Sequence, residues 1–124
     1  MNTTHKPEIF ITESDRKALH SLAFAALSTP DIADELLNEL DRAKITDHNK
    51  PVNYIGIGSK TTFMSAGKER TVELVMPEDA DISLGRISIL TPVGVALLGL
   101  SEGQSIDWTV RDGRAGTLTI VKIF

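Results

Sequence analysis

The hydrophobic positions in the first third of the chain recur at the spacing of α-helices. Residues 12–27 carry one apolar stripe and residues 30–44 carry a second, a pattern typical of amphipathic helices. The stripe residues are Ala18, Leu19, Leu22, Ala23, Ala26 and Leu27 in the first segment and Ile32, Ala33, Leu36, Leu37, Leu40 and Ala43 in the second. Thr12 and Asp15 have the spacing of an N-cap, and Pro30 suits a first helical position. The pattern predicts two successive helices.

The break between the two predicted helices is short. Residues 28–30, with the sequence Ser-Thr-Pro, end the first helix and restart the chain, and Thr29 is placed to cap the second. So short a connection predicts an antiparallel hairpin, because only that arrangement buries both stripes. At about 1.5 Å per residue, helices of about fourteen residues reach only about 21 Å. We therefore expect residues 1–48 to form a short helical finger, a short coiled coil of two helices.

The pattern changes after a polar stretch that ends at Pro51, and residues 49–51 are interpreted as a linker. From there on, short β-branched segments alternate with turn residues, which is typical of strands. These segments span residues 52–59, 61–65, 70–76, 85–92, 105–111 and 116–124. An apolar run over residues 93–100 follows Pro92 and predicts one short helix laid on the sheet. Residues 52–124 are thus predicted to form an antiparallel β domain, and the whole chain an α+β fold.

Composition and charge narrow the functional classes. The 124 residues include 13 Lys and Arg against 17 Asp and Glu, for a net charge of −4. No basic run is present, which disfavours direct, sequence-specific binding of nucleic acid. The absence of cysteine excludes a disulfide framework and a thiolate nucleophile. The longest apolar run, residues 93–100, is far shorter than the roughly 18 residues that cross a bilayer. We expect a soluble, cytoplasmic monomer with no membrane partner.

Few side chains indicate catalysis. His5, His20 and His48 are not spaced as a metal-binding pair, and no Gly-x-Ser-x-Gly elbow is present. Residues 56–61, Gly-Ile-Gly-Ser-Lys-Thr, are only superficially similar to a phosphate-binding loop, because strand sequence follows where a helix is required. Glycines that allow a bend or a close backbone contact in a strand explain this segment better.

One candidate site lies at the predicted tip of the hairpin. Asp31, Asp34 and Glu35 begin the second predicted helix. Paired carboxylates there could hold a divalent cation or act as acid and base. Acidic residues at a helix start also complement the positive end of the helix dipole, and this is the interpretation we favour.

A second candidate site is an apolar corner before the predicted short helix. It consists of Leu90, Thr91, Pro92 and Val93. Such a corner is either ordinary core or part of a protein-binding edge. The residues alone leave both interpretations open.

The order of motifs in the second half resembles that of a known family. The motifs are Gly67-Lys68-Glu69, then residues 75–81 (VMPEDAD), 85–89 (GRISI), 91–99 (TPVGVALLG) and 102–104 (EGQ). In this order they resemble the Gre transcript-cleavage factors over residues 52–124. The resemblance implies an FKBP-like fold for these residues. It also implies docking on bacterial RNA polymerase at the rim of its secondary channel.

The resemblance assigns a role to the apolar corner. The Asp-Ser-Pro docking motif of the family falls on Leu90-Thr91-Pro92, which implies that Leu90, Thr91, Pro92 and Val93 bind RNA polymerase. Leucine stands in the place of the acid, so one polar contact of the family is missing. Leu90 could bury apolar surface there instead.

The length of the finger then decides between branches of the family. In the cleavage factors, a long coiled coil carries acidic tip residues to a catalytic metal in the polymerase, whereas a finger of about 21 Å cannot reach it. The chain is therefore similar to a short-fingered relative that binds polymerase, competes with Gre factors and does not cleave transcripts. On this interpretation Asp31, Asp34 and Glu35 are a non-catalytic acidic tip. We expect no enzyme activity, metal or cofactor.

Two alternatives remain open. FKBP-like domains include peptidyl-prolyl isomerases, whose pockets are built from aromatic side chains, but the second domain has only Tyr54, Phe63, Trp108 and Phe124. A weak transcript-cleavage activity would instead use Asp31 and Asp34 as metal ligands. An isomerase assay and a transcript-shortening assay distinguish these alternatives from a pure binding protein.

Overall fold

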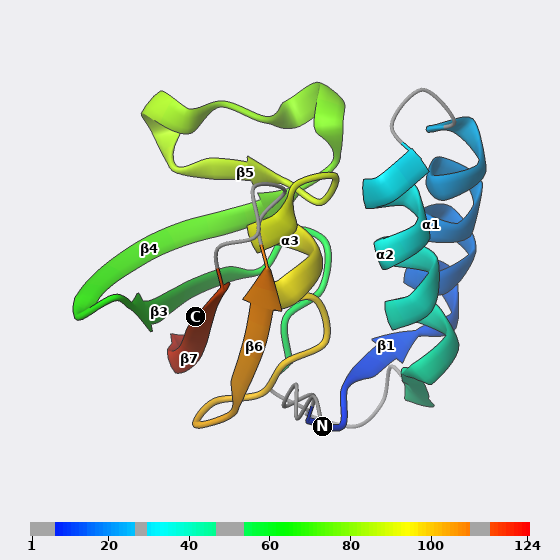
Figure 1. Ribbon diagram of the computed structural model, residues 1–124. Helices are drawn as coiled ribbons and strands as arrows, with labels where there is room; N and C mark the ends of the chain where they lie inside the picture. The colour runs from blue at the N-terminus through cyan, green and yellow to red at the C-terminus, as the bar shows by residue number, and fades with distance from the viewer. Residues whose placement is uncertain (1–6, 27–29, 47–53, 110–114) are drawn as a thin grey trace.

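The computed structural model describes residues 7–26, 30–46, 54–109 and 115–124 (Figure 1). Within these residues the fold mixes helices with two sheets. The first part contains β1 (Phe10–Thr12), α1 (Glu13–Ala25), α2 (Pro30–Arg42) and β2 (Lys44–Thr46). The second part contains β3 (Lys60–Ser65), β4 (Lys68–Val75), the 3-10 helices η1 (Pro77–Asp79) and η2 (Ile82–Leu84), β5 (Arg86–Ser88), α3 (Pro92–Leu97), β6 (Ser105–Thr109) and β7 (Ala115–Ile123).

Both helices predicted in the first part are present. Thr12 is the N-cap of α1, as its spacing predicted, because its hydroxyl accepts a hydrogen bond of 3.2 Å from the backbone N–H of Asp15. Helices α1 and α2 lie side by side (Figure 1). Their predicted stripes supply buried residues, namely Leu19, Ala23, Ala26, Ala33, Leu36 and Leu40. The predicted cap at Thr29 lies outside the described residues.

A short strand pair that the sequence pattern did not predict closes the base of the two helices. Strand β1 precedes α1 and β2 follows α2, and the two pair in parallel with Phe10 opposite Lys44. Three-residue strands are too short to show an alternating pattern. The pair ties the start of α1 to the end of α2.

The main sheet has five strands in the order β5-β4-β3-β7-β6. Strand β3 pairs antiparallel with β4 and β7, and β6 pairs antiparallel with β7. The prediction of a wholly antiparallel sheet is wrong at one edge, where β5 runs parallel to β4. The chain crosses from the end of β4 through η1 and η2 before it enters β5 (Figure 1). A tight hairpin would have placed β5 antiparallel to β4, whereas this crossover lets the two strands run in the same direction.

The predicted strand over residues 52–59 is also wrong in its described part. Tyr54 makes only an isolated bridge with Ser101, and a turn follows in which the N–H of Ser59 donates to the carbonyl of Gly56 at 3.1 Å. Gly58 has a φ of +90°, which favours glycine. The predicted bend is present, but it lies in a turn and not in a strand, and the atom nearest to a Cβ on Gly56, at 2.9 Å, is the side-chain Oδ2 of Asp15 instead of a backbone atom.

The two parts of the chain share one hydrophobic core. Helix α3 contacts β5 and β6 on one side and α2 on the other, so it lies between the sheet and the helix pair (Figure 1). The same buried cluster contains Leu19 and Leu36 from the helix pair together with Phe63, Leu74 and Leu97 from the second part. The helix pair therefore packs against the second part along α2. The predicted linker, residues 49–51, lies outside the described residues.

Candidate functional site

The apolar corner of Leu90, Thr91, Pro92 and Val93 joins β5 to α3. Thr91 is the N-cap of α3, since its hydroxyl accepts from the N–H of Gly94 at 3.0 Å. The same hydroxyl donates to the carbonyl of Ser88 at 2.8 Å. The N–H of Leu90 donates to the hydroxyl of Ser88 at 3.0 Å. The Thr91 hydroxyl is thus engaged in closing the turn.

A close backbone approach makes the corner compact. A Cβ on Gly94 would lie 2.2 Å from the carbonyl oxygen of Ser88 and 2.9 Å from Cα of Ile89. No side chain fits at such distances, so glycine is required where α3 begins under β5. The corner therefore holds one shape, set by Ser88, Thr91 and Gly94 together.

The four residues of the corner are half-buried. Leu90 and Val93 pack against the core cluster, yet all four corner residues keep part of their surface accessible. Leu90 and Val93 therefore contribute both to the core and to the surface, and a role of the corner in protein binding stays a prediction.

The predicted acidic tip lies at the start of α2. Asp31, Asp34 and Glu35 are exposed. In the described part of the chain, no three His, Asp or Glu side chains lie close enough together to hold a metal ion. Helix α2 begins toward the upper end of the view in Figure 1, whereas α3 begins nearer its middle, beneath β5.

The structure reveals a surface that sequence reasoning missed. Ile82 and Leu84, here called the η2 knob, lie in η2 and are 84% and 64% exposed. Asp81 caps this helix, because its Oδ1 accepts from the N–H of Ser83 at 3.1 Å and from the Ser83 hydroxyl at 2.6 Å. The hydroxyl bond holds the pKa of Asp81 below its ordinary value. The only sequence signal is a pair of large apolar residues between Asp81 and Gly85, just before the predicted strand of residues 85–92.

A shallow cavity of about 310 Å³ lies between the turn after Tyr54, β4, η1 and β5. It is lined by Ile57, Gly58, Glu73, Val75, Met76, Asp79 and Arg86. Phe63 is instead buried in the core. Phe124 is exposed and carries the Lys60 and Lys122 ammonium groups 5.7 Å and 4.9 Å from its ring centroid. No aromatic side chain that the structure describes lines the cavity.

A further finding concerns membranes. In the described part of the chain, no helix combines the length and the apolar character that are needed to span a bilayer.

Comparison with known families defines the class of protein. Residues 50–124 match the family described as "Transcription elongation factor, GreA/GreB, C-term", and residues 7–45 match the family described as "Rnk N-terminus". The first match covers the sheet, α3 and the apolar corner, and the second covers the helix pair. The chain belongs to the GreA/GreB family, in the branch that carries the Rnk N-terminus, so the resemblance seen in the sequence is confirmed.

Individual relatives agree with this assignment. The "Regulator of nucleoside diphosphate kinase" of Escherichia coli strain K12 is 34% identical over 125 residues, which is 95% of this chain and 90% of that protein. The "Transcription elongation factor GreA" of Thermodesulfovibrio yellowstonii is 37% identical over 75 residues, 58% of this chain and 48% of that protein.

A solved structure extends the likeness to three dimensions. A "Prokaryotic transcription elongation factor GreA/GreB from Nitrosomonas europaea" aligns with a TM-score of 0.72 and 37% identity, over 95% of this chain and 98% of that one. The same overall architecture, helix pair and sheet together, is therefore present in an independently solved member of the family.

Proposed function

We propose that this protein is a cytoplasmic transcription regulator that binds bacterial RNA polymerase near the secondary channel through residues 52–124. The observation that carries the proposal is the GreA/GreB match over residues 50–124, because that stretch contains the whole main sheet, α3 and the apolar corner. We also propose that this half has the FKBP-like fold of the family and that the apolar corner contacts the polymerase.

The shape of the corner supports a docking role. Leu90 stands where the family has an acid, and it is only partly covered by the core. Complete burial of a leucine against a partner stabilises a complex by about 1.5–3 kcal/mol, and a side chain that is already half-buried contributes the lower part of that range. Because Ser88, Thr91 and Gly94 fix the turn, little conformational entropy is lost when a partner covers it.

The dimensions of the helix pair support binding without transcript cleavage. Helices α1 and α2 have 13 residues each, which gives about 20 Å at 1.5 Å per residue. Helix α2 also packs against α3, so much of this length lies alongside the second part. The acidic tip of Asp31, Asp34 and Glu35 would then stay outside the polymerase active site. The protein would compete with Gre factors for a shared docking position.

The remaining parts of the proposal follow from charge and size. A net charge of −4 disfavours direct contact with nucleic acid, and we propose that the polymerase itself is the partner and that no cofactor takes part. We propose that the protein acts as a monomer and is not an enzyme. The cavity near Tyr54 has no described aromatic lining, so no observation favours an isomerase.

The proposal is tested by titration of the full chain into core RNA polymerase. Saturable binding is expected, and Leu90→Asp combined with Pro92→Ala is expected to change the affinity at least tenfold. Val121→Ser, an exposed position on β7, is the matched control and leaves affinity unchanged. Stalled transcription complexes incubated with the protein keep transcripts of the original length. Absence of binding by the unmutated protein would refute the proposal.

A further inference from the structure

The η2 knob, Ile82 and Leu84, is the most exposed pair of large apolar side chains in the part of the chain that the structure describes. The exposed fractions are 84% for Ile82 and 64% for Leu84. Single exposed apolar residues are common on protein surfaces. Two such residues on one turn, both turned away from the core, are characteristic of an interaction surface.

Hydrogen bonds hold the knob outward in a fixed conformation. Asp81 and Arg86 exchange backbone bonds of 3.0 Å and 2.9 Å at the base of the loop. Within the loop, the N–H of Leu84 donates to the Asp81 carbonyl at 3.0 Å. Gly85, with a φ of +75°, ends η2, and its carbonyl accepts from Glu73 of β4 at 2.8 Å. A loop braced in this way cannot fold its apolar side chains back onto the core.

The position of the knob relates it to the apolar corner. Strand β5 is an edge strand of the main sheet, the knob lies immediately before it, and the corner follows it. Figure 1 shows the crossover of η1 and η2 above β5. The knob and the corner therefore lie at opposite ends of β5.

The charges around the knob indicate the chemistry of its partner. Glu78, Asp79 and Asp81 are exposed in the same crossover, and Arg86 is the one basic residue between positions 77 and 88. A partner surface that complements the crossover has an apolar pocket with Lys or Arg at its rim, since opposite charges favour association and like charges oppose it. The same acidic surround disfavours nucleic acid.

We infer that the η2 knob is a second docking point on the polymerase, and that it inserts into an apolar pocket with a basic rim while the corner makes the first contact. This inference rests on the proposed function, because it takes the polymerase as the partner of the corner. Two separated contacts on one rigid edge would fix the orientation of the protein as well as its affinity.

The test measures the affinity of the full chain for core RNA polymerase. Ile82→Ser combined with Leu84→Ser is expected to weaken binding at least tenfold and to leave the melting temperature unchanged, because both side chains are exposed. The matched control, Val121→Ser with Phe124→Ser, removes exposed apolar surface elsewhere and is expected to change affinity less than twofold. Glu78→Gln with Asp79→Asn is expected to make the affinity less dependent on salt.

Other results of these binding measurements distinguish a failure of the knob as a docking point from a failure of the proposed function. If the unmutated protein binds and the knob variant binds equally well, the knob is not a docking point and the proposed function stands. If the unmutated protein does not bind polymerase, the proposed function itself fails. If analytical ultracentrifugation shows a dimer of the unmutated protein that the knob variant loses, the knob contacts a second copy of the chain, which overturns the inference.

Discussion

Ile9 lies so close to Gly99 that a Cβ added to Gly99 would be 2.7 Å from Cβ of Ile9. The N–H of Phe10 also donates to the carbonyl of Gly99 at 3.1 Å. The chain just before α1 therefore crosses directly over the turn between α3 and β6. This crossing joins the helix pair to the sheet and helps to make one core from the two parts.

Substitution of Gly99 is expected to loosen that junction. Gly99 has a φ of +79°, which costs an alanine about 1–2 kcal/mol, and the clash with Ile9 adds about 1–3 kcal/mol of overpacking. Gly99→Ala should thus lower the free energy of unfolding by about 2–5 kcal/mol, as measured by urea denaturation. Gly103→Ala is the control, since Gly103 has a φ of +85° and open space around it, and should cost only about 1–2 kcal/mol. Equal losses would contradict the close packing of Ile9.

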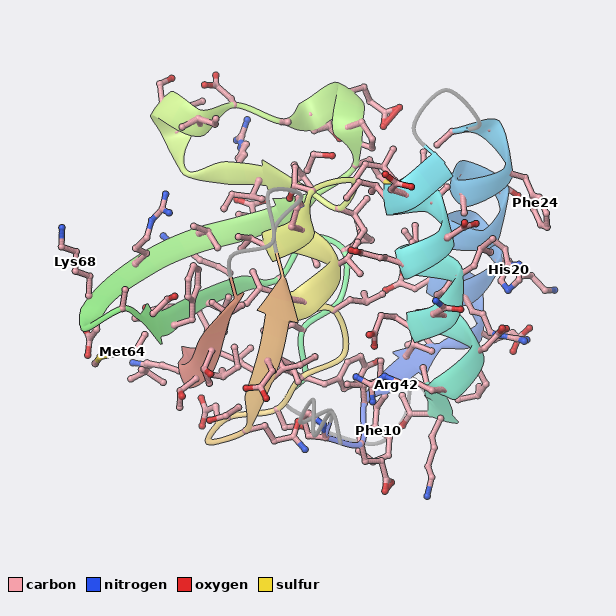
Figure 2. The ribbon with its side chains drawn as sticks, viewed as in Figure 1. Phe10, His20, Phe24, Arg42, Met64 and Lys68 are labelled. Atoms are coloured by element: carbon pink, nitrogen blue, oxygen red, sulfur yellow. The ribbon has the colours of Figure 1, made fainter. Side chains whose placement is uncertain are left out.

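Arg42 lies near the base of the helix pair (Figure 2) and is expected to stabilise it. Its Nε donates to Oε2 of Glu39 at 2.6 Å, and the Glu39 side chain is only 6% exposed. Its Nη1 also donates to the carbonyl of Pro7. Because Arg42 itself is 25% exposed, Arg42→Ala should destabilise the fold by about 3 kcal/mol, the lower end for a broken buried pair.

Lys44→Ala provides the control for Arg42→Ala. The Lys44 and Glu8 side chains pair at 3.0 Å but are 64% and 49% exposed. An exposed pair of this kind contributes under about 1 kcal/mol. If the two variants lost equal stability in thermal or urea denaturation, the burial of Glu39 would not make its pair with Arg42 more stabilising than an exposed pair.

Thr91 is expected to act mainly through the fold. Loss of its hydroxyl removes the cap of α3, so Thr91→Ala should cost about 0.5–2 kcal/mol of folding stability. Thr91→Ser keeps the hydroxyl and should retain most of that stability. Chemical denaturation of both variants checks this. A Thr91→Ala variant as stable as the unmutated protein would show that the cap contributes nothing.

The cap that Asp81 forms on η2 is expected to depend on pH. The hydrogen bond from the Ser83 hydroxyl lowers the pKa of Asp81 from its ordinary value of 3.8. A carboxyl whose pKa is lowered by folding stabilises the fold above its unfolded pKa, near 3.9, and loses that effect as the pH falls through the folded pKa. The η2 cap should therefore persist from neutral pH down to about pH 4.

Nuclear magnetic resonance titration of the Asp81 carboxyl tests the pH prediction. Its pKa should lie below 3.8, and Ser83→Ala should move it upward, because the hydroxyl bond is the largest cause of the shift. If the pKa of Asp81 is unchanged in Ser83→Ala, the hydrogen bond from the Ser83 hydroxyl is not the cause of the shift. An ordinary pKa in the unmutated protein would show that the cap does not form in solution.

The helices were predictable from the sequence because their signals are local. Thr12 caps α1 as its spacing with Asp15 indicated, and Pro92 begins α3 as the apolar run after it indicated. The family was predictable as well, because the order of its motifs is more specific than any one motif. These signals depend on residues close together in the chain.

The parts that were not predicted depend on contacts between distant residues. Strand β5 pairs with β4 in parallel because η1 and η2 carry the chain across, and the turn at Gly56 lies beside Asp15 of α1, whose Oδ2 accepts from the N–H of Ile57 at 3.4 Å. The packing of α2 on α3 likewise has no signal within either helix. The η2 knob was missed because exposure, unlike hydrophobicity, cannot be read from Ile82 and Leu84 alone.

The most direct test of the central claim is competition for RNA polymerase between this protein and a Gre factor. A labelled Gre factor is bound to core polymerase, and the unlabelled full chain is then titrated in. The account predicts displacement of the Gre factor in a saturable manner, with no shortening of transcripts in stalled complexes. Simultaneous binding of both proteins, or no binding of this chain at any concentration, would contradict the account.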